Sequence, residues 1–424
     1  MREARVGATD FVRRHRGDFL IVLFMSILIL LGLVVIYSIS PALTARINAA
    51  GNSLDQNHFM YRQVAYIAAG VLAFALAAIV PLGWWKKHQN KLLLAGLVLC
   101  LVPVVAQGTA ISLCTNGACR WINLGFVSLQ PAEIVKFALL IFLAGFLAKR
   151  VTEGKLNDKH ETLWPLAVIL GVASLVVIVL QKDLGTGITF FGIAVTMLYV
   201  AGLNKRYFGI ALLALLGLGF IFIVTSPHRL ERVATFFNGS SEDASGAGYH
   251  INQALIAVGS GGVTGKGLGR SIQAFGYLPE AANDSIFAIF AEKFGFLGTV
   301  AVLGIFAALF MRLLRVMDAA ANIYQRLIVA GVFGWVFTHT AVNIGAMLGI
   351  FPLTGITLPF LSFGGTSLLF IMGALGLTLN ISRYTVHQRP QADANGKGSY
   401  YEDYRSGRRI GRTRNTGIGR TARS

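Results

Sequence analysis

The chain has 424 residues, of which 55% are hydrophobic and only 13% are charged, and its mean hydropathy is +0.64. These values exclude a soluble globular protein of this length and are typical of a protein that lies in a lipid bilayer. The formal net charge of +18 comes largely from short basic loops and from the C-terminal residues.

The apolar residues form long runs, each near the roughly 20 residues that an α-helix needs to cross about 30 Å of hydrocarbon. The first run is too long for a signal-peptide core and no small-residue cleavage site follows it, so we expect it to remain as a span. We predict an all-α polytopic membrane protein with about ten transmembrane helices, at residues 19–40, 61–81, 91–109, 131–149, 164–180, 186–202, 207–226, 285–313, 327–350 and 366–382.

Basic residues occupy alternate short loops, which the positive-inside rule assigns to the cytoplasm. They recur at Arg13, Arg14, Arg16, Lys86–Lys87, Lys149–Arg150, Lys205–Arg206 and Arg312–Arg315. We therefore expect both termini to be cytoplasmic, with an N-terminal segment at 1–18, a membrane domain at 19–382 and a basic tail without fixed structure at 383–424. We expect this tail to contact anionic membrane lipid or a cytoplasmic protein, and we expect no nucleic acid among the partners.

The other loops face outward in this topology, at 41–60, 110–130, 181–185, 227–284 and 351–365. The loop at 227–284, between the seventh and eighth helices, is the longest, and long connections are uncommon unless they are functional. Amphipathic spacing predicts a short helix within it from Tyr249 to Val258. The segment FPLTGITLPFLSFGG at 351–365 is too apolar for a solvated loop and too broken by proline and glycine for a spanning helix. We expect it to re-enter the protein and line a cavity.

Cys114 and Cys119 flank an Asn116–Gly117 turn in the outer loop CTNGAC. A local disulfide and two free thiols are both compatible with this spacing on the outer face. In either case the pair indicates a structural role.

Charged residues occur near the outer end of the fourth span. Glu133 and Lys136 are one helical turn apart below the outer surface, where they either pair with each other or face a polar cavity that binds a ligand headgroup. Arg120 and Trp121 precede them, and an arginine and a tryptophan at the interface can bind a phosphate or anchor the helix.

Asp284 stands where a glycine-rich polar loop meets the apolar eighth span, with Glu280 four residues before it. A carboxylate at a membrane boundary can face water on one side, and a second carboxylate nearby suits a general base. Asp284 is also a good helix N-cap residue, as are its neighbours Asn283 and Ser285, so the sequence leaves capping and catalysis open.

The run GSGGVTGKGLGR at 259–270 fails as a Walker A motif, because Ser260 and Gly267 stand where the motif needs Gly and Ser or Thr. Its backbone N–H groups and Lys266 either bind a phosphate of an extracytoplasmic ligand or form turns that fold the chain back. Arg232 opens the long loop and is a candidate for binding pyrophosphate or for anchoring at the interface.

Asp183 and Glu292 indicate structural carboxylates. No cluster with metal-ligand spacing occurs, although a divalent cation such as Mg²⁺ or Mn²⁺ could assist a pyrophosphate leaving group.

Four motifs together resemble the SEDS family (shape, elongation, division and sporulation). They are RWINLGFVSLQPAEIVK at Arg120–Lys136, QKDLGTG at Gln181–Gly187, the segment from Gly248 through AEKFGFLG at Ala291–Gly298, and NIGAMLGIFPLTGITLPFLSFGGTSLL at Asn343–Leu369. Their order and spacing run along nearly the whole membrane region. YLPEA at Tyr277–Ala281 favours the division-type over the elongation-type members.

The resemblance implies a ten-span peptidoglycan glycosyltransferase that polymerises lipid II on the outer face, with a class B penicillin-binding transpeptidase and other division-complex membrane proteins as partners. The family's essential aspartate, in its Pro-Glu-x-x-Thr-Asp-Phe pattern, falls on Asp284, which is the expected general base. The residues expected to bind substrate are Arg120, Glu133, Lys136, Arg232, Lys266 and Glu280.

A lipid II flippase is the alternative, and a third reading is a scaffold that recruits division proteins through its tail. A transporter predicts polar groups spread through the bilayer midplane, whereas here they gather at the outer face. The sequence therefore favours the enzyme, in the plasma membrane at the division septum.

Overall fold

The computed structural model describes residues 12–14, 16–49, 51, 53–115, 118–125, 127–224, 230, 233 and 246–386. Residues 11–387 form one compact unit, and the chain's other unit, 1–10 with 388–424, lies outside the described residues. Most of the predicted N-terminal segment and basic tail, and Arg232, therefore lie outside them too.

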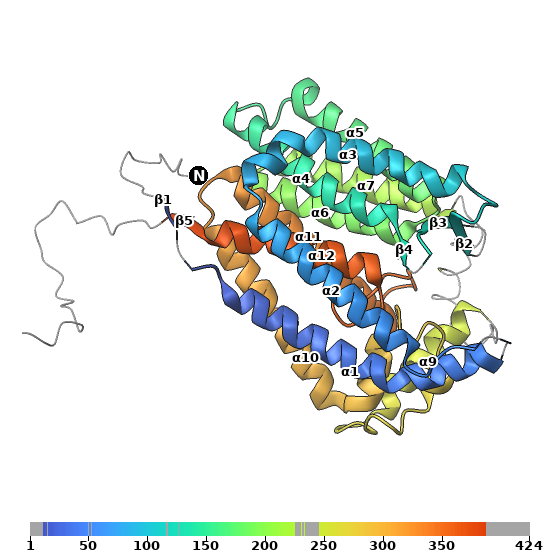
Figure 1. The fold of residues 1–424 in the computed structure, drawn as a ribbon. Coiled ribbons are helices and arrows are strands. Elements are labelled where there is room, and N and C mark those ends of the chain that lie inside the picture. Colours follow the sequence, from blue (N-terminus) through green and yellow to red (C-terminus); the bar gives the residue numbers. More distant parts are fainter. Residues whose placement is uncertain are drawn as a thin grey trace, which may run out of the picture. The chain divides into compact units, whose positions relative to one another are not determined.

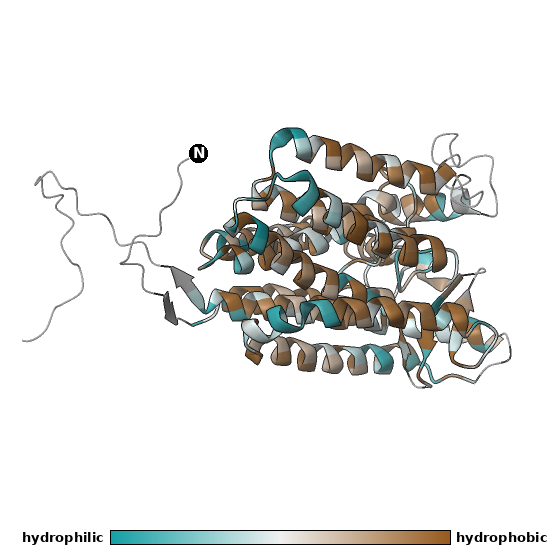
Figure 2. Cartoon of the chain, turned by 90° about the horizontal axis from the view of Figure 1, so that it is seen from above, coloured by the Kyte–Doolittle hydropathy of each residue, from teal (hydrophilic) through white to brown (hydrophobic). Residues whose placement is uncertain are grey.

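Ten helices in the described part of the chain are long and apolar enough to cross a membrane, which confirms the predicted class and number of spans. Hydrophobic residues cover the lengths of the helices, and hydrophilic residues gather near their ends (Figure 2). In chain order (Figure 1), the spans are α1 (Phe19–Ala49), α2 (His58–Ile79), α3 (Leu82–Val105), α4 (Pro131–Thr152), the joined segments η1 (Lys159–Leu163), α5 (Trp164–Ser174) and η2 (Leu175–Leu180), then α6 (Leu184–Ala201), α7 (Lys205–Val224), α10 (Ile286–Asp318), α11 (Ile323–Met347) and α12 (Gly365–Ser382).

The first span is longer than predicted, because α1 continues through Pro41 to Ala49. The prediction of a loop over 41–60 was therefore wrong for residues 41–49, and also for 58–60, where α2 has already begun. Proline removes the N–H donor of position 41, and three residues later the hydroxyl of Thr44 donates to the carbonyls of Ser40 and Pro41, each at 3.0 Å.

Short strands, which the sequence analysis did not predict, lie at both ends of the bundle. β2 (Ser112–Thr115), β3 (Ala118–Asn123) and β4 (Ser128–Leu129) form an antiparallel sheet in the outer loop, and a disulfide joins Cys114 to Cys119. At the opposite end of the bundle (Figure 1), β1 (Val12–Arg14) pairs with β5 (Tyr384–Val386), so both ends of the membrane domain lie together.

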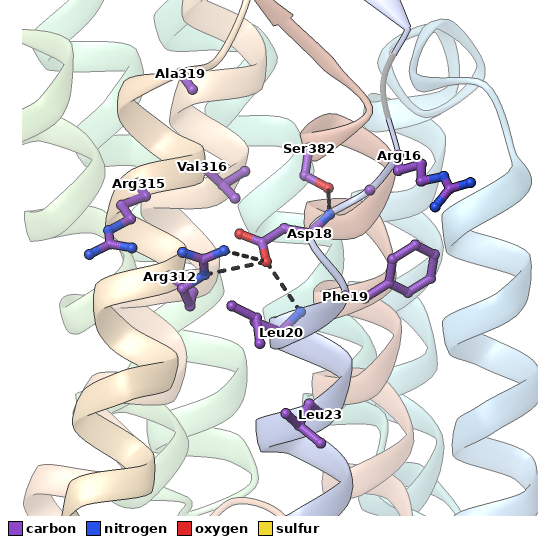
Figure 3. Close-up of a pocket in the computed structure, with 11 residues that line it drawn as sticks. Arg16, Asp18, Phe19, Leu20, Leu23, Arg312, Arg315, Val316, Ala319 and Ser382 are labelled. Atoms are coloured by element: carbon purple, nitrogen blue, oxygen red, sulfur yellow. Dashed lines mark hydrogen bonds and ion pairs between the residues drawn. The ribbon is translucent and has the colours of Figure 1, made fainter. Parts of the chain in front are cut away.

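The two ends are also joined by side chains. Asp18, just before α1, accepts a charged hydrogen bond of 3.0 Å from Arg312 of α10, and its N–H donates to Ser382 at the end of α12 (Figure 3). These contacts tie the beginning of α1 to the ends of two later helices.

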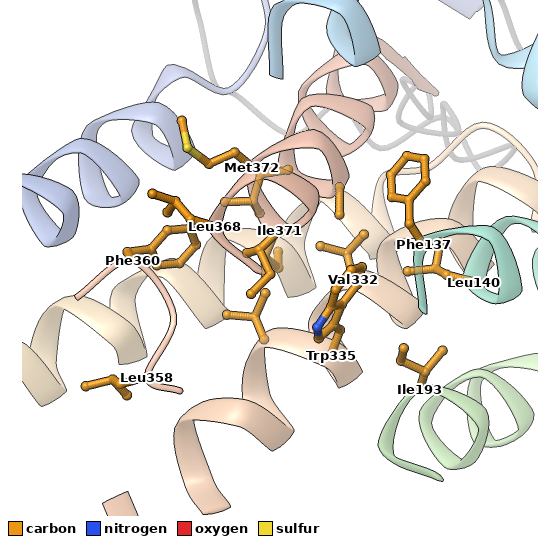
Figure 4. Packing of buried hydrophobic residues seen from close by; sticks show 14 of the residues in the cluster. Phe137, Leu140, Ile193, Val332, Trp335, Leu358, Phe360, Leu368, Ile371 and Met372 are labelled. Carbon is orange, nitrogen blue, oxygen red and sulfur yellow. The ribbon is translucent and has the colours of Figure 1, made fainter. Parts of the chain in front are cut away.

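The core lies along α4, α6, α11 and α12. Trp335 of α11 is fully buried and lies between Val332, Ile193 of α6 and Ile371 of α12 (Figure 4). Glycines allow the helices to approach closely, since a β-carbon on Gly376 would clash with the backbone of Phe74. By contrast, the described length of α7 buries none of its residues within the chain.

The long outer segment contains α9 (Ala247–Ser260), which confirms the short helix predicted there, and η3 (Gln273–Phe275). Between them, the glycine-rich turn crosses a kink of α10 at Gly295, whose φ is +67°. The N–H groups of Phe296 and Leu297 donate to the carbonyls of Gly262 and Val263 at 2.9 and 3.1 Å. The kink thus provides hydrogen bonds for the turn that lies across it.

We expect Gly295→Ala to lower the free energy of unfolding by about 2 to 4 kcal/mol, because alanine disfavours a positive φ and its β-carbon would clash with the backbone of Gly265 and Val263. The matched control is Gly304→Ala in the same helix, where a β-carbon meets nothing within 4 Å. That substitution should stabilise the protein slightly. Denaturant titration of the two purified variants compares them, and equal stability would contradict the account of the kink.

Candidate functional site

The segment between α11 and α12 enters the protein, as predicted. Leu358, Phe360 and Leu361 are buried, and a β-carbon on Gly32 of α1 would clash with the backbone of Leu361. A cavity of about 10 Å³, room for about one water molecule, is bounded by Thr357 and residues that follow it. This re-entrant segment, residues 351–364, forms one wall of the site described below.

Asn343 of α11 joins the re-entrant segment to the beginning of α10. Its side-chain amide donates to the carbonyl of Asp284 and to the carbonyl of Ile356, both at 2.7 Å. The N–H of Phe363 also donates to the carbonyl of Ala282 at 2.8 Å. These three hydrogen bonds therefore hold the backbone at Asp284 and just before it against the same wall.

Asp284 is half-buried, and its carboxylate faces the re-entrant segment. A β-carbon on Gly355 would lie 4.0 Å from Oδ2 of Asp284. Helix α10 begins at Ile286 with Ser285 in the N-cap position, and the Ser285 hydroxyl bonds the carbonyl of Pro279 and the ring of His250. Asp284 is thus one residue before the cap, and the structure favours a role other than capping.

Glu280 shapes the turn that leads to Asp284. Its φ is +49°, and its carbonyl accepts from the N–H groups of Asn283 and Ser285 at 2.9 and 3.2 Å. Its exposed carboxylate accepts a hydrogen bond of 2.5 Å from the amide of Asn283. The two carboxylates predicted to act together therefore lie in one turn.

Glu133 and Lys136 form a buried ion pair of 2.7 Å, with only 5% and 2% of their side chains exposed. Lys136 Nζ is also 3.3 Å from Nε2 of His339, and Nδ1 of His339 is 3.3 Å from the carbonyl of Thr357. This network connects α4 through α11 to the re-entrant segment. The sequence left open whether Glu133 and Lys136 pair with each other or face a polar cavity, and the structure shows that they pair.

Lys266 forms a 3.0 Å ion pair with Glu292, a fully buried residue two turns into α10. Its own N–H and that of Gly267 donate to the carbonyls of Glu292 and Lys293 at 2.9 Å. Those two N–H groups of the glycine-rich turn therefore bind the protein's own backbone, which supports the chain-reversal interpretation over the phosphate site.

Arg120 lies in β3 and donates to the carbonyls of Gln181 and Lys182 at 3.1 and 2.6 Å. The neighbouring Asp183 accepts from the N–H and hydroxyl of Thr186 and from Gln130, which agrees with the structural role predicted for it. Arg120 thus fixes the outer turn between the fifth and sixth spans.

Comparisons with known proteins identify the family of this chain. The family model described as a cell cycle protein, which covers FtsW, RodA and SpoVE, matches residues 18–387. The chain belongs to the SEDS family. A protein named probable peptidoglycan glycosyltransferase FtsW from Thiomicrospira cyclica is 38% identical over 87% of this chain and 92% of that protein. Stage V sporulation protein E of Bacillus subtilis is 36% identical over 88% and 99%.

Solved structures of family members share this fold. A chain from a structure described as the coordination of polymerization and crosslinking by a peptidoglycan synthase complex has a TM-score of 0.67 and 25% identity, covering 87% of this chain and 98% of that one. Thermus thermophilus RodA, the rod shape determining protein, has a TM-score of 0.60 and 26% identity over 87% and 97%. The ten-span SEDS architecture is therefore confirmed for this chain.

Sequence reasoning missed several polar residues of the site in this SEDS protein. Arg62 of α2 is 6.0 Å from the ring of Phe363, and its Nε is buried without a hydrogen-bond partner among the described residues. Next to it, Gln63 is fully buried and its amide is 3.4 Å from the carbonyl of Ser362. The signal that could have identified Arg62 was a basic residue one turn into an apolar span, the same signal that identified Lys136.

Glu292 anchors the outer segment through four hydrogen bonds, from Lys266 Nζ, Ser271 Oγ and the N–H groups of Ile272 and Gln273. We expect Glu292→Gln to cost about 3 kcal/mol of folding free energy, because the new amide N–H₂ would face these donors. The readout is denaturant titration together with limited proteolysis of 261–273. Lys266→Met should cost less, because the carboxylate of Glu292 still accepts hydrogen bonds from Ser271 Oγ and from the N–H groups of Ile272 and Gln273. A larger cost for Lys266→Met than for Glu292→Gln would contradict this role of Glu292.

The residues that the structure describes contain no group of three or more His, Cys, Asp or Glu side chains that could hold a metal ion. Asp284 and Glu280 are nevertheless two carboxylates in one turn. Mg²⁺ often binds through one or two carboxylates together with substrate phosphates.

Proposed function

We propose that this protein is a peptidoglycan glycosyltransferase that polymerises lipid II on the outer face of the membrane during cell division, with Asp284 as general base. Relatives named peptidoglycan glycosyltransferase FtsW support the activity and the division-type assignment. The observation that carries the proposal is the half-buried carboxylate of Asp284 against the re-entrant segment, with its backbone held by Asn343.

The reaction is an inverting glycosyl transfer. The 4-hydroxyl of one lipid-linked disaccharide attacks the anomeric carbon of another chain, and Asp284 accepts the hydroxyl proton as the new C–O bond forms. The bond from the anomeric carbon to the phosphate oxygen breaks, and undecaprenyl pyrophosphate leaves with the electron pair. A sugar hydroxyl is a poor nucleophile, so positioned proton transfer is typically worth about 10² to 10⁴ in rate.

The leaving pyrophosphate requires positive charge. Among the predicted cations, Lys136 and Lys266 are paired with buried carboxylates, and Arg120 donates to two carbonyls. Each would bind the pyrophosphate either in addition to these contacts or in exchange for them. Among the described residues, no acceptor contacts the buried Nε–H of Arg62, and Arg62 lies beside Phe363, whose N–H donates to the carbonyl of Ala282. Arg62 is therefore added to the proposed substrate-binding residues.

A divalent cation fits this site as a companion of the pyrophosphate rather than as a resident metal, because the described residues offer no three-ligand cluster. Asp284 and Glu280 are the carboxylates that would contact it. Its chemistry would be to neutralise charge on the leaving group.

We infer that the partner is a class B penicillin-binding transpeptidase, acting with other division-complex membrane proteins at the septum. The similar chain from a synthase complex that coordinates polymerization and crosslinking supports a crosslinking partner. The positive-inside rule supports cytoplasmic termini, and the pairing of β1 with β5 puts the two ends of the membrane domain on the same side.

The test is to supply labelled lipid II to the protein, purified with its transpeptidase partner, and to separate the products by gel electrophoresis. Glycan strands are expected. Liposomes containing the same labelled lipid distinguish the flippase: lipid scrambling without strand formation would overturn the glycosyltransferase proposal.

A further inference from the structure

A second site lies at the end of α10 opposite Asp284. A cavity of about 730 Å³ opens between the beginning of α1 and the last turns of α10, next to the end of α12, and its size is in the range of small-ligand sites. The proposed glycosyl transfer uses none of its residues. It is lined by Arg16, Gly17, Asp18, Phe19, Leu20, Leu23, Arg312, Arg315, Val316, Ala319 and Ser382.

The cavity carries an excess of positive charge. Among the described residues that line it, the only carboxylate is that of Asp18, which Arg312 engages at 3.0 Å. Arg16 and Arg315 flank this pair on opposite sides, and both are exposed (Figure 3). Within the part of the chain that the structure describes, neither guanidinium group has a hydrogen bond or an ion pair. Two guanidinium groups therefore remain to bind an anion, and arginine suits phosphate geometry.

The wall toward the membrane is apolar. Phe19, Leu20 and Leu23 belong to the first turns of the first span and are 62%, 40% and 49% exposed. A basic rim above an exposed apolar wall at the end of a span matches a molecule with an anionic headgroup and hydrocarbon chains. A free phosphate would use the arginines and leave the apolar wall uncovered.

We propose that this cavity binds the phosphate-bearing headgroup of an anionic phospholipid in the leaflet on the side of β1 and β5. Arg16 and Arg315 point to opposite sides of the Asp18–Arg312 pair (Figure 3), so both side chains turn toward the headgroup on binding. The acyl chains lie along Phe19 and Leu23, and the bound lipid joins α1 to α10. Because α10 carries Asp284 just before its other end, the lipid holds the far end of the helix that begins at the proposed active site.

Native mass spectrometry of the full-length, detergent-purified chain tests the proposal by titration with phosphatidylglycerol and, separately, with phosphatidylcholine. We expect preferential binding of phosphatidylglycerol, and a fall of about thirtyfold in its affinity for the double variant Arg16→Gln/Arg315→Gln. The matched control is Lys87→Gln/Lys91→Gln, which removes two exposed charges from the beginning of α3 and should bind as the wild type does.

Three results would overturn the proposal. These are equal binding of the two lipids, unchanged affinity in the arginine variant, and an equal loss in the lysine control. Competition with free glycerol phosphate separates the sources of the phosphate: failure to displace the lipid supports the lipid site, and displacement at equal concentration overturns it. Both arginine side chains are exposed and have no hydrogen bond or ion pair to any described residue, so the variants should fold. The measurement does not depend on glycosyltransferase activity.

Discussion

Asp284→Asn is expected to reduce strand formation from labelled lipid II by at least about 100-fold. The amide has nearly the same shape and keeps the backbone carbonyl that accepts from Asn343 at 2.7 Å. It cannot accept a proton from the attacking hydroxyl, so the loss should fall on the rate of polymerisation, where general-base catalysis contributes about 10² to 10⁴. The measurement is the initial rate of strand formation by the variant purified with its partner.

The matched control is Asp55→Asn, which removes an exposed carboxylate between the first two spans, on the same outer side. This variant should polymerise at the rate of the wild type. Equal amounts of glycan strands from Asp284→Asn and the wild type would refute the assignment of the base. A loss in both variants would point to surface charge and not to proton transfer.

Lys136→Met should lower the free energy of unfolding by about 3 to 5 kcal/mol, because it leaves Glu133 as a buried carboxylate without its cation. The variant also loses the contacts of Lys136 Nζ with His339 and with the ring of Trp335, which lies 5.6 Å from Nζ. The free energy of unfolding is measured by denaturant titration, with tryptophan fluorescence as the signal.

The double variant Glu133→Gln/Lys136→Met separates a structural role of this pair from substrate binding. Uncharged residues of similar size in place of a buried ion pair are often neutral or stabilising, so the double variant should recover most of the stability. If it is stable and still polymerises lipid II, the pair acts through the fold. If it is stable but inactive, Lys136 or Glu133 contacts the substrate. A single variant as stable as the double would contradict the burial argument.

The ten spans could be predicted because each depends on a local property, the run of about 20 apolar residues that hydrocarbon requires. The re-entry of residues 351–364 could also be predicted from local composition, because this segment is too apolar for a solvated loop and too rich in proline and glycine for a spanning helix. The early end predicted for the first span was wrong, because a polar continuation of a helix beyond the bilayer leaves no hydropathy signal. The motif order predicted the family and, by resemblance, the position of Asp284.

The pairings were decided by the tertiary structure. The sequence left open whether Lys266 binds a phosphate or pairs with a residue of the protein. Its pairing with Glu292 depends on where the glycine-rich turn crosses α10. That crossing requires the positive φ of Gly295, which the spacing of residues in the sequence does not reveal. Asn343 and Arg62 reach the site from helices distant in sequence, so no local pattern joined them to Asp284. Hydropathy is summed along the chain, whereas hydrogen bonds and ion pairs depend on distances across it, and only the folded bundle sets those distances.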